Sequence, residues 1–158
     1  PRSEGLDLPG SVFSMLDGID CWLPDGGPAG LGFVEGSLAV QPDTWFFEAH
    51  FFQDPVIPGS LGLESFQQLL KHVARLRWPE LVESHRFEPI AVGREHTWLY
   101  RGQVVPSNER VVVRAWIDSI EEGPEPVIVA SGFLLVDGRP IYEMRGFSLR
   151  AVQAEGGP

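Results

Sequence analysis

The chain has 158 residues, 43% of them hydrophobic and 22% charged, which is enough for one globular domain with a buried core. Its 22 acidic and 12 basic residues give a net charge of −10, which argues against a nucleic-acid-binding surface because phosphate contacts depend on clustered Lys and Arg. No uninterrupted apolar run approaches the ~18 residues that a membrane span requires.

The two ends of the chain have the composition of linkers. Residues 1–10 (PRSEGLDLPG) lack the basic and apolar stretches of a secretion signal, and residues 153–158 (QAEGGP) are mostly small or polar. We therefore expect one domain over residues 11–152, cut from a longer polypeptide. Cys21 is the single cysteine, so no internal disulfide can form and a reducing cytoplasm is the expected compartment.

The first third of the chain predicts two strands and an aromatic loop. Residues 11–22 (SVFSMLDGIDCW) predict a first strand, and the turn sequence DGGPAG separates it from a second strand over residues 32–40. The segment WFFEAHFF that follows is short and is bounded by Asp54-Pro55. It predicts a loop or a single helical turn.

A helix is predicted over residues 60–77, directly after Pro58-Gly59. Apolar residues recur there at helical spacing, and the pattern ends at Trp78-Pro79. These apolar residues are Leu61, Leu63, Phe66, Leu69, Leu70, Val73 and Leu76. Because they occupy more than one face of the helix, we expect a curved sheet to wrap it.

The second half of the chain predicts an antiparallel meander. Four runs rich in Val, Ile, Leu and aromatic residues are each followed by a turn, over residues 96–105, 110–120, 126–136 and 140–152. Asp137-Gly138 predicts a tight type I′ hairpin, because both residues tolerate positive φ. The fold class is therefore α+β, with a long antiparallel sheet wrapped around a central helix.

One segment brings together the groups needed for acid–base chemistry. His50 lies among aromatic residues, where a neutral imidazole can accept a proton. Gly59 lies at the start of the helix, where unpaired N–H groups can stabilise a carbonyl oxygen that gains negative charge. Glu64 follows on an otherwise apolar stretch of the same helix, where a carboxyl group can retain a proton to donate.

These three groups match the needs of β-elimination of water from a thioester. The base would remove the acidic C2 proton, the N–H would polarise the carbonyl, and the acid would protonate the departing C3 hydroxyl. Neither a metal nor a redox cofactor is needed. His50, Asp54 and Glu64 do not have the spacing of a compact metal-ligand set.

The stretch WFFEAHFFQDPVIPGSLGLESFQQLL closely resembles the active-site segment of the FabA-like β-hydroxyacyl-acyl-carrier-protein dehydratases. It is most similar to the dehydratase domains of polyunsaturated fatty acid and polyketide synthases. The stretch YRGQVVPSNERVVVRAWI resembles the strand pair of that family, and VDGRPIYEMRGFSL resembles its closing hairpin. The resemblance covers roughly residues 12–150.

This resemblance implies a hot-dog fold and a dimer, or a pseudo-dimer with an adjacent hot-dog domain, with an acyl tunnel at the interface. It implies that His50 is the catalytic histidine, Glu64 the acid and Gly59 the backbone donor to the thioester carbonyl. Gln68 is expected to support the acid, with Val56 and Pro58 as further supporting residues beside the substrate. The histidine and the acid of one site would come from different units. The substrate would arrive on the phosphopantetheine of an acyl carrier protein, with no other cofactor.

Several alternatives stay open at this point. Glu64 is typical of pure dehydratases, whereas the surrounding residues resemble the dehydratase-isomerases, so movement of the double bond from C2 to C3 is undecided. The chain length and stereochemistry of the acyl group are also open. Other functions for the same fold are a non-catalytic unit that binds acyl carrier protein, a thioesterase and a lipid-binding module. Arg94, Arg101 and Arg114 are candidates for a carrier-docking patch.

Overall fold

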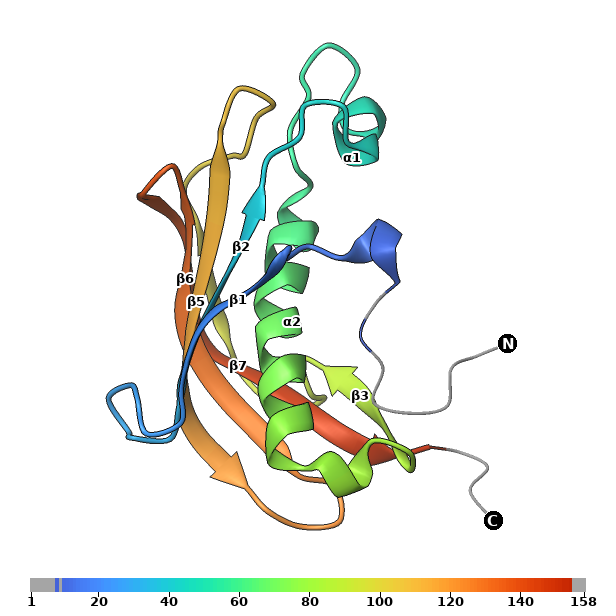
Figure 1. Ribbon diagram of the computed structural model, residues 1–158, viewed down its shortest axis with the longest axis vertical. Helices are drawn as coiled ribbons and strands as arrows, with labels where there is room; N and C mark the ends of the chain where they lie inside the picture. The colour runs from blue at the N-terminus through green and yellow to red at the C-terminus, as the bar shows by residue number, and fades with distance from the viewer. Residues whose placement is uncertain (1–7, 9, 155–158) are drawn as a thin grey trace.

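A computed structural model describes residue 8 and residues 10–154, so most of the two expected linkers lies outside the described residues. The central element is helix α2, which packs in the hollow of a curled antiparallel sheet (Figure 1). The elements in chain order are η1 (Ser11–Phe13), β1 (Gly18–Leu23), β2 (Phe33–Ala39), α1 (Trp45–Ala49), α2 (Gly59–Arg77), η2 (Pro79–Leu81), β3 (His85–Pro89), β4 (Thr97–Tyr100), β5 (Arg110–Glu121), β6 (Val127–Val136) and β7 (Arg139–Gln153). The predicted helix and the predicted fold class are confirmed.

The sheet is antiparallel throughout. Within the described residues its strand order is β1-β2-β5-β6-β7-β3, and β4 also pairs with β7. Buried residues alternate with more exposed ones along β5 and β6, because one face of these strands meets α2 and the other meets solvent. The register shifts between Ile117 and Ser119 and between Ala130 and Gly132. Such bulges increase the local twist and bend a sheet around its contents.

Glycines let α2 approach the sheet closely. A side chain on Gly132 would lie 2.7 Å from the ring of Phe66, and one on Gly36 would lie 3.1 Å from Leu69. Phe66 and Leu69 are both fully buried, and they belong to the same core cluster as the inward-facing residues of β5, β6 and β7. The missing Cβ atoms therefore create the space that the apolar face of α2 fills.

Two strand predictions need correction. The predicted strand over residues 11–22 begins only at Gly18, because the backbone groups of Phe13 and Met15 bond to Gln68 of α2 rather than to a strand. The strand predicted over residues 96–105 is limited to β4, and it pairs with β7 rather than with β5. The meander is therefore limited to β5, β6 and β7.

Strand β3 was not predicted from the sequence. Its sequence, HRFEP, is short and polar and ends in proline, so it lacks a hydrophobic alternation that would reveal it. It pairs with the end of β7, where Phe87 lies opposite Ala151.

The predicted hairpin between β6 and β7 is confirmed. Asp137 and Gly138 have φ values of 48° and 80°, as a type I′ turn requires. The Asp137 carboxylate also accepts hydrogen bonds from the backbone N–H groups of Arg110 and Glu109 and from the Asn108 side chain. The Arg110 N–H is the main reason that the pKa of Asp137 is lowered. The turn residue thus also fixes the start of β5.

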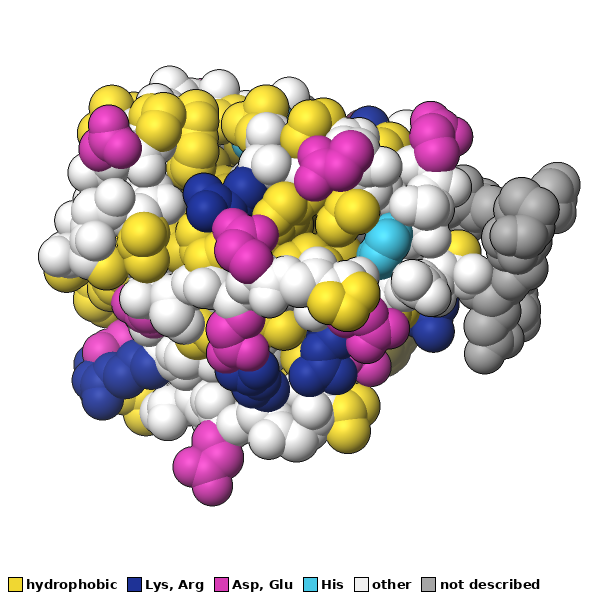
Figure 2. Space-filling model, turned by 90° about the horizontal axis from the view of Figure 1, so that it is seen from below, with side chains coloured by type: hydrophobic (Ala, Val, Ile, Leu, Met, Phe, Trp, Pro, Cys, Tyr) yellow, Lys and Arg dark blue, Asp and Glu magenta, His cyan; other side chains and the backbone are white. Residues whose placement is uncertain are grey.

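Charges of both signs are mixed on the surface. On the face in Figure 2, Lys and Arg side chains lie beside Asp and Glu side chains and do not gather into one basic patch. The ion pairs Arg77–Glu122 and Arg94–Glu121 are examples of this mixing. In the described part of the chain, none of the helices is long and apolar enough to cross a membrane.

We expect Gln67→Met to raise the free energy of unfolding by ~1 kcal/mol. Gln67 is 2% exposed, and neither its amide nitrogen nor its amide oxygen has a hydrogen-bond partner among the described residues. Methionine has a similar length and leaves no polar group unsatisfied. Urea unfolding of the variant and the wild type measures the difference.

Gln68→Met is the matched control, because this neighbouring glutamine makes three hydrogen bonds. It should lose ~1–3 kcal/mol, as its buried backbone partners would lose their bonds. A Gln67→Met variant that is less stable than the wild type would mean that the Gln67 amide has a partner in the folded protein.

Candidate active site

His50 lies at the end of α1, where residues 45–49 form the predicted single turn. Its backbone carbonyl accepts a hydrogen bond from the Val56 N–H at 3.0 Å, and its Nδ1 lies 3.3 Å from the Val56 carbonyl oxygen. A carbonyl can only accept, so Nδ1 is the donor in this contact, and in a neutral ring the lone pair then lies on Nε2. The half-buried ring also contacts Phe51, with centroids 3.9 Å apart. The side chain is therefore arranged to accept a proton at Nε2.

The loop after His50 is closed by its own backbone. Phe51 and Asp54 exchange two hydrogen bonds of 3.1 and 3.2 Å, as expected for a turn at Asp54-Pro55. The tip of this loop points outward, and Phe52 is 91% exposed. A large apolar side chain so exposed is a candidate for contact with another protein surface.

Gly59 is the first residue of α2, and Pro58 caps the helix without a side-chain hydrogen bond. Leu61 donates its N–H to Pro58, whereas the Gly59 N–H has no partner among the described residues. Val56 is buried and Pro58 is half-buried. The helix start is braced by a 2.9 Å bond from the Ile57 N–H to the Val104 carbonyl. An unpaired N–H at a helix N-terminus is a suitable donor to a carbonyl oxygen.

Aromatic residues of two strands surround this helix start. A side chain on Gly59 would lie 3.1 Å from Trp98 and 3.3 Å from Tyr100, so only glycine leaves the two rings in place. Tyr100 in turn contacts Tyr142 of β7, with ring centroids 4.9 Å apart. Burial, together with the nearby Tyr100, raises the pKa of Tyr142 above its usual value. The tyrosine therefore stays neutral at physiological pH.

Glu64 lies just over one turn further along α2 and is half-buried. Its Oε1 accepts two hydrogen bonds, from Lys71 Nζ at 2.8 Å and from Gln68 Nε2 at 3.1 Å. The expected contact of Gln68 with this carboxyl group is thus present. Oε2 has no hydrogen-bond partner among the described residues. The side chain is held at one oxygen and leaves the other available.

Gln68 is itself fixed by the segment that precedes β1. Its Oε1 accepts the Met15 N–H at 2.9 Å, and its Nε2 donates to the Phe13 carbonyl at 2.8 Å. The same segment contacts α1, because the indole N–H of Trp45 donates to the Val12 carbonyl. Residues 12–15 therefore connect the helix that carries Glu64 with the helix that precedes His50.

In the part of the chain that the structure describes, no hydrogen bond joins the side chains of His50 and Glu64. The apolar space between α2 and the sheet beside Ile57, Leu61 and Tyr142 measures only ~10 Å³. That is room for no more than one water molecule, so an acyl chain has no place there.

Lys71 is a site residue that we did not predict. It is 8% exposed, which is unusual for lysine, and its ammonium group lies against Glu64. A signal for it exists in the sequence: seven residues, or about two helical turns, separate Glu64 from Lys71, so both lie on one face of α2.

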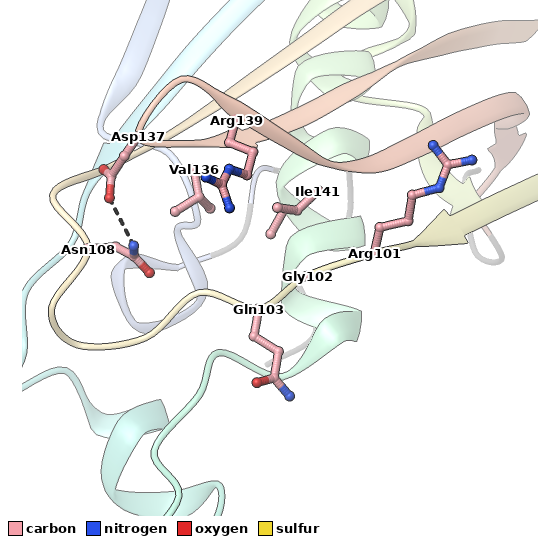
Figure 3. A pocket seen from close by; sticks show the side chains of 8 residues that line it. All are labelled: Arg101, Gly102, Gln103, Asn108, Val136, Asp137, Arg139 and Ile141. Atoms are coloured by element: carbon pink, nitrogen blue, oxygen red, sulfur yellow. Dashed lines mark hydrogen bonds between the residues drawn. The ribbon is translucent and has the colours of Figure 1, made fainter.

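A pocket of about 420 Å³ lies beside the segment that braces the helix start (Figure 3). Its lining includes Arg101, Arg139 and Asp137, and none of the predicted site residues. The three arginines considered for a docking patch have different surroundings. Arg94 pairs with Glu121 and Arg114 pairs with Glu35, whereas Arg101 lies at this pocket.

The described residues contain no group of three or more His, Cys, Asp and Glu side chains that could hold a metal ion. His85 is instead occupied by structural bonds of 2.8 Å with Ser84 and with the Pro124 carbonyl.

Comparison with known proteins gives matches over most of the chain. The family model of the FabA-like domain matches residues 8–145. One of the subunits of the polyunsaturated fatty acid synthase of Thraustochytrium sp. is 35% identical over 159 aligned residues. The match covers 98% of this chain, which spans only 10% of that much longer protein.

Two solved structures share the arrangement of a curled sheet around a helix. The dehydratase heterocomplex ApeI:P of Xenorhabdus doucetiae matches with a TM-score of 0.61 and 12% identity, over 98% of this chain and 94% of that chain. A thioesterase family protein of Silicibacter pomeroyi matches with a TM-score of 0.54 and 18% identity, over 92% and 91%. At these identities the likeness establishes the fold alone.

Proposed function

Because this chain belongs to the FabA-like domain family and has the hot-dog fold, we propose that it removes water from a 3-hydroxyacyl thioester to give a 2-enoyl thioester. The observation that carries this proposal is the arrangement of His50. Its Nδ1 donates to the Val56 carbonyl, so that Nε2 of a neutral ring can accept a proton. The unpaired N–H of Gly59 follows nine residues later in the sequence. A base and a carbonyl-polarising donor are what removal of a C2 proton requires.

The elimination uses three groups. The thioester carbonyl accepts the Gly59 N–H, which stabilises the negative charge that develops on the oxygen. Nε2 of His50 takes the C2 proton, and the electrons of the C2–H bond form the C2–C3 double bond. The C3–O bond breaks as the hydroxyl group receives a proton from Glu64 and leaves as water. His50 ends protonated and Glu64 ends as a carboxylate. Before the next cycle His50 must therefore lose a proton and Glu64 must regain one.

We place the His50 and Glu64 of one site on two different hot-dog units. The absence of a hydrogen bond between them among the described residues and the filled interior between α2 and the sheet support this arrangement. Strand β4 pairs only with β7 among the described residues, and its side chains include the partly exposed Trp98 and Tyr100. An unpaired edge with exposed aromatic residues is a surface that proteins usually cover.

The second unit is a copy of this chain or a different hot-dog domain. The similar ApeI:P structure is named as a heterocomplex, which supports pairing with a different hot-dog domain. The similarity to a polyunsaturated fatty acid synthase supports an acyl carrier protein as the carrier of the substrate. Isomerisation of the product to the C3 double bond would use the same base and acid.

A hot-dog thioesterase is the second candidate function. The observation that favours it is the hydrogen bond from Lys71 to Glu64, because a carboxylate held in place can activate water to attack a thioester. In that reaction the acyl–sulfur bond breaks, and a free thiol and a carboxylic acid result.

The products distinguish the two candidates. The purified protein should convert a 3-hydroxyacyl pantetheine thioester into a species lighter by one water, with the absorbance of a conjugated enoyl thioester. A 3-enoyl product of the same mass, without that absorbance, indicates that isomerisation follows. Free thiol without an enoyl product supports the thioesterase. Substrate binding without either product, both alone and with the neighbouring synthase domain, contradicts both catalytic proposals.

A further inference from the structure

Lys71 is an unusual lysine. Its side chain is only 10% exposed, and a lysine is rarely so buried unless a partner compensates its charge. Its Nζ lies 2.8 Å from Oε1 of Glu64, whose side chain is 27% exposed. A buried cation at this distance interacts with the carboxyl group more strongly than a cation on the surface does.

The contacts of Glu64 are divided unequally between its two oxygens. Lys71 and Gln68 both bond to Oε1. Gln68 cannot follow the carboxyl group if it moves, because Phe13 and Met15 hold its amide from the other side. Oε1 is therefore fixed from two directions, and Oε2 is the oxygen that can carry a proton toward a ligand.

From this geometry we infer that Lys71 is a positioning residue for Glu64 in the dehydration, an inference that rests on the proposed function. It holds Oε1 so that Oε2 faces the C3 hydroxyl group. Its positive charge also stabilises the carboxylate that forms at Glu64 when the proton leaves for the hydroxyl group. Lys71 transfers no proton itself and touches no substrate atom.

The other elements around this pair do not supply the same charge. The segment of residues 13–15 meets Gln68 through backbone groups, and the Ser14 hydroxyl donates to the Leu16 carbonyl. The opposite side of the helix start packs on Tyr142, which stays neutral. Lys71 is thus the cation that hydrogen-bonds Glu64 among the described residues.

The test is the kinetics of Lys71→Met with a 3-hydroxyacyl pantetheine thioester. We expect kcat to fall ~10- to 100-fold, while KM changes less than about threefold, because the lost interaction forms fully only as Glu64 becomes charged. Lys71→Arg should recover most of the rate, since the guanidinium keeps the charge and can reach the same oxygen. Arg77→Met is the matched control, because this cation of α2 pairs with Glu122 on the surface. It should leave both constants unchanged.

A double-mutant cycle separates positioning from a general structural role. In a Glu64→Gln background, Lys71→Met should cause no further loss, because the charge that it stabilises no longer forms. Equal losses in both backgrounds, or a wild-type kcat in Lys71→Met, would overturn the inference. If Lys71→Met does not fold, Lys71→Gln is measured in its place, since it keeps a polar group at this buried position. If the wild type removes no water from the substrate, the proposed function and this inference are both wrong. If the wild type is active and the Lys71 variant is equally active, only the inference is wrong.

Discussion

We expect His50→Ala to lower kcat/KM for dehydration by ~10³-fold, and Glu64→Gln to lower it by a similar factor. Each change removes one partner of an acid–base pair, and such a partner contributes ~10²–10⁴-fold. Glutamine has the shape of the glutamate it replaces but has no proton to donate. Mass spectrometry of the thioester measures the loss of water, and thermal unfolding of each variant confirms that the fold is retained.

A mixture of the two inactive variants tests whether a site is shared between two copies. A dimer with one His50→Ala chain and one Glu64→Gln chain has one intact site, so refolding an equal mixture should restore about a quarter of the wild-type rate. Each variant refolded alone is the control and should stay inactive. A mixture that stays inactive although the two chains form mixed dimers would contradict a site built from two copies of this chain. If the single variants retain the wild-type rate, the acid–base roles themselves are wrong.

Gly132→Ala is expected to lower the free energy of unfolding by ~3 kcal/mol, because an added methyl group overpacks the interior. The new Cβ would lie 1.9 Å from the carbonyl oxygen of Arg114 and 2.7 Å from the ring of Phe66. The first neighbour is backbone of the paired strand and the second is a fully buried ring on α2, so neither can move aside freely. Either β6 separates from β5 or the helix moves away from the sheet.

Gly18→Ala is the matched control for this prediction, because a side chain at Gly18 would meet no atom within 4 Å. It should change the stability by less than ~0.5 kcal/mol. Urea unfolding at a fixed protein concentration measures both variants. A Gly132→Ala protein as stable as the wild type would show that the sheet can open at this position at little cost.

The central helix and the strands of the meander were predictable because their signals are local. The apolar spacing between Leu61 and Leu76 identifies a helix, and its predicted end at residue 77 agrees with the structure. Asp137-Gly138 fixed the hairpin for the same reason, since the backbone conformation of a two-residue turn depends on the two residues themselves. Such features depend on few distant contacts.

The partners of the short strands could not be predicted, because their pairing is decided far along the chain. Phe87 of β3 pairs with Ala151, and Trp98 of β4 pairs with Met144. Neither strand has an alternation long enough to define a register. The segment before β1 was wrongly predicted as strand for a related reason: its backbone bonds to α2, where the side-chain oxygen of Gln68, 53 residues after Met15, accepts the Met15 N–H.

The candidate site was predictable in its residue types and less so in its contacts. The motif around His50 and Glu64 indicated a base and an acid, but it contained no information about which oxygen of Glu64 is held. Lys71 was missed because a lysine on a helix is ordinarily a solvent-exposed residue. Only the folded structure brings its ammonium group to the carboxyl group of Glu64.

Strand β7 pairs with β6, β3 and β4, and among the described elements it is the last one along the chain. During synthesis, β3 and β4 therefore remain without their strand partner until residues 139–153 have left the ribosome. Contacts over such sequence separations form slowly, and unpaired edges expose a nascent chain to aggregation. Strand β4 also supplies the aromatic residues that surround Gly59. The site that begins at His50 is therefore completed only near the end of translation of this domain.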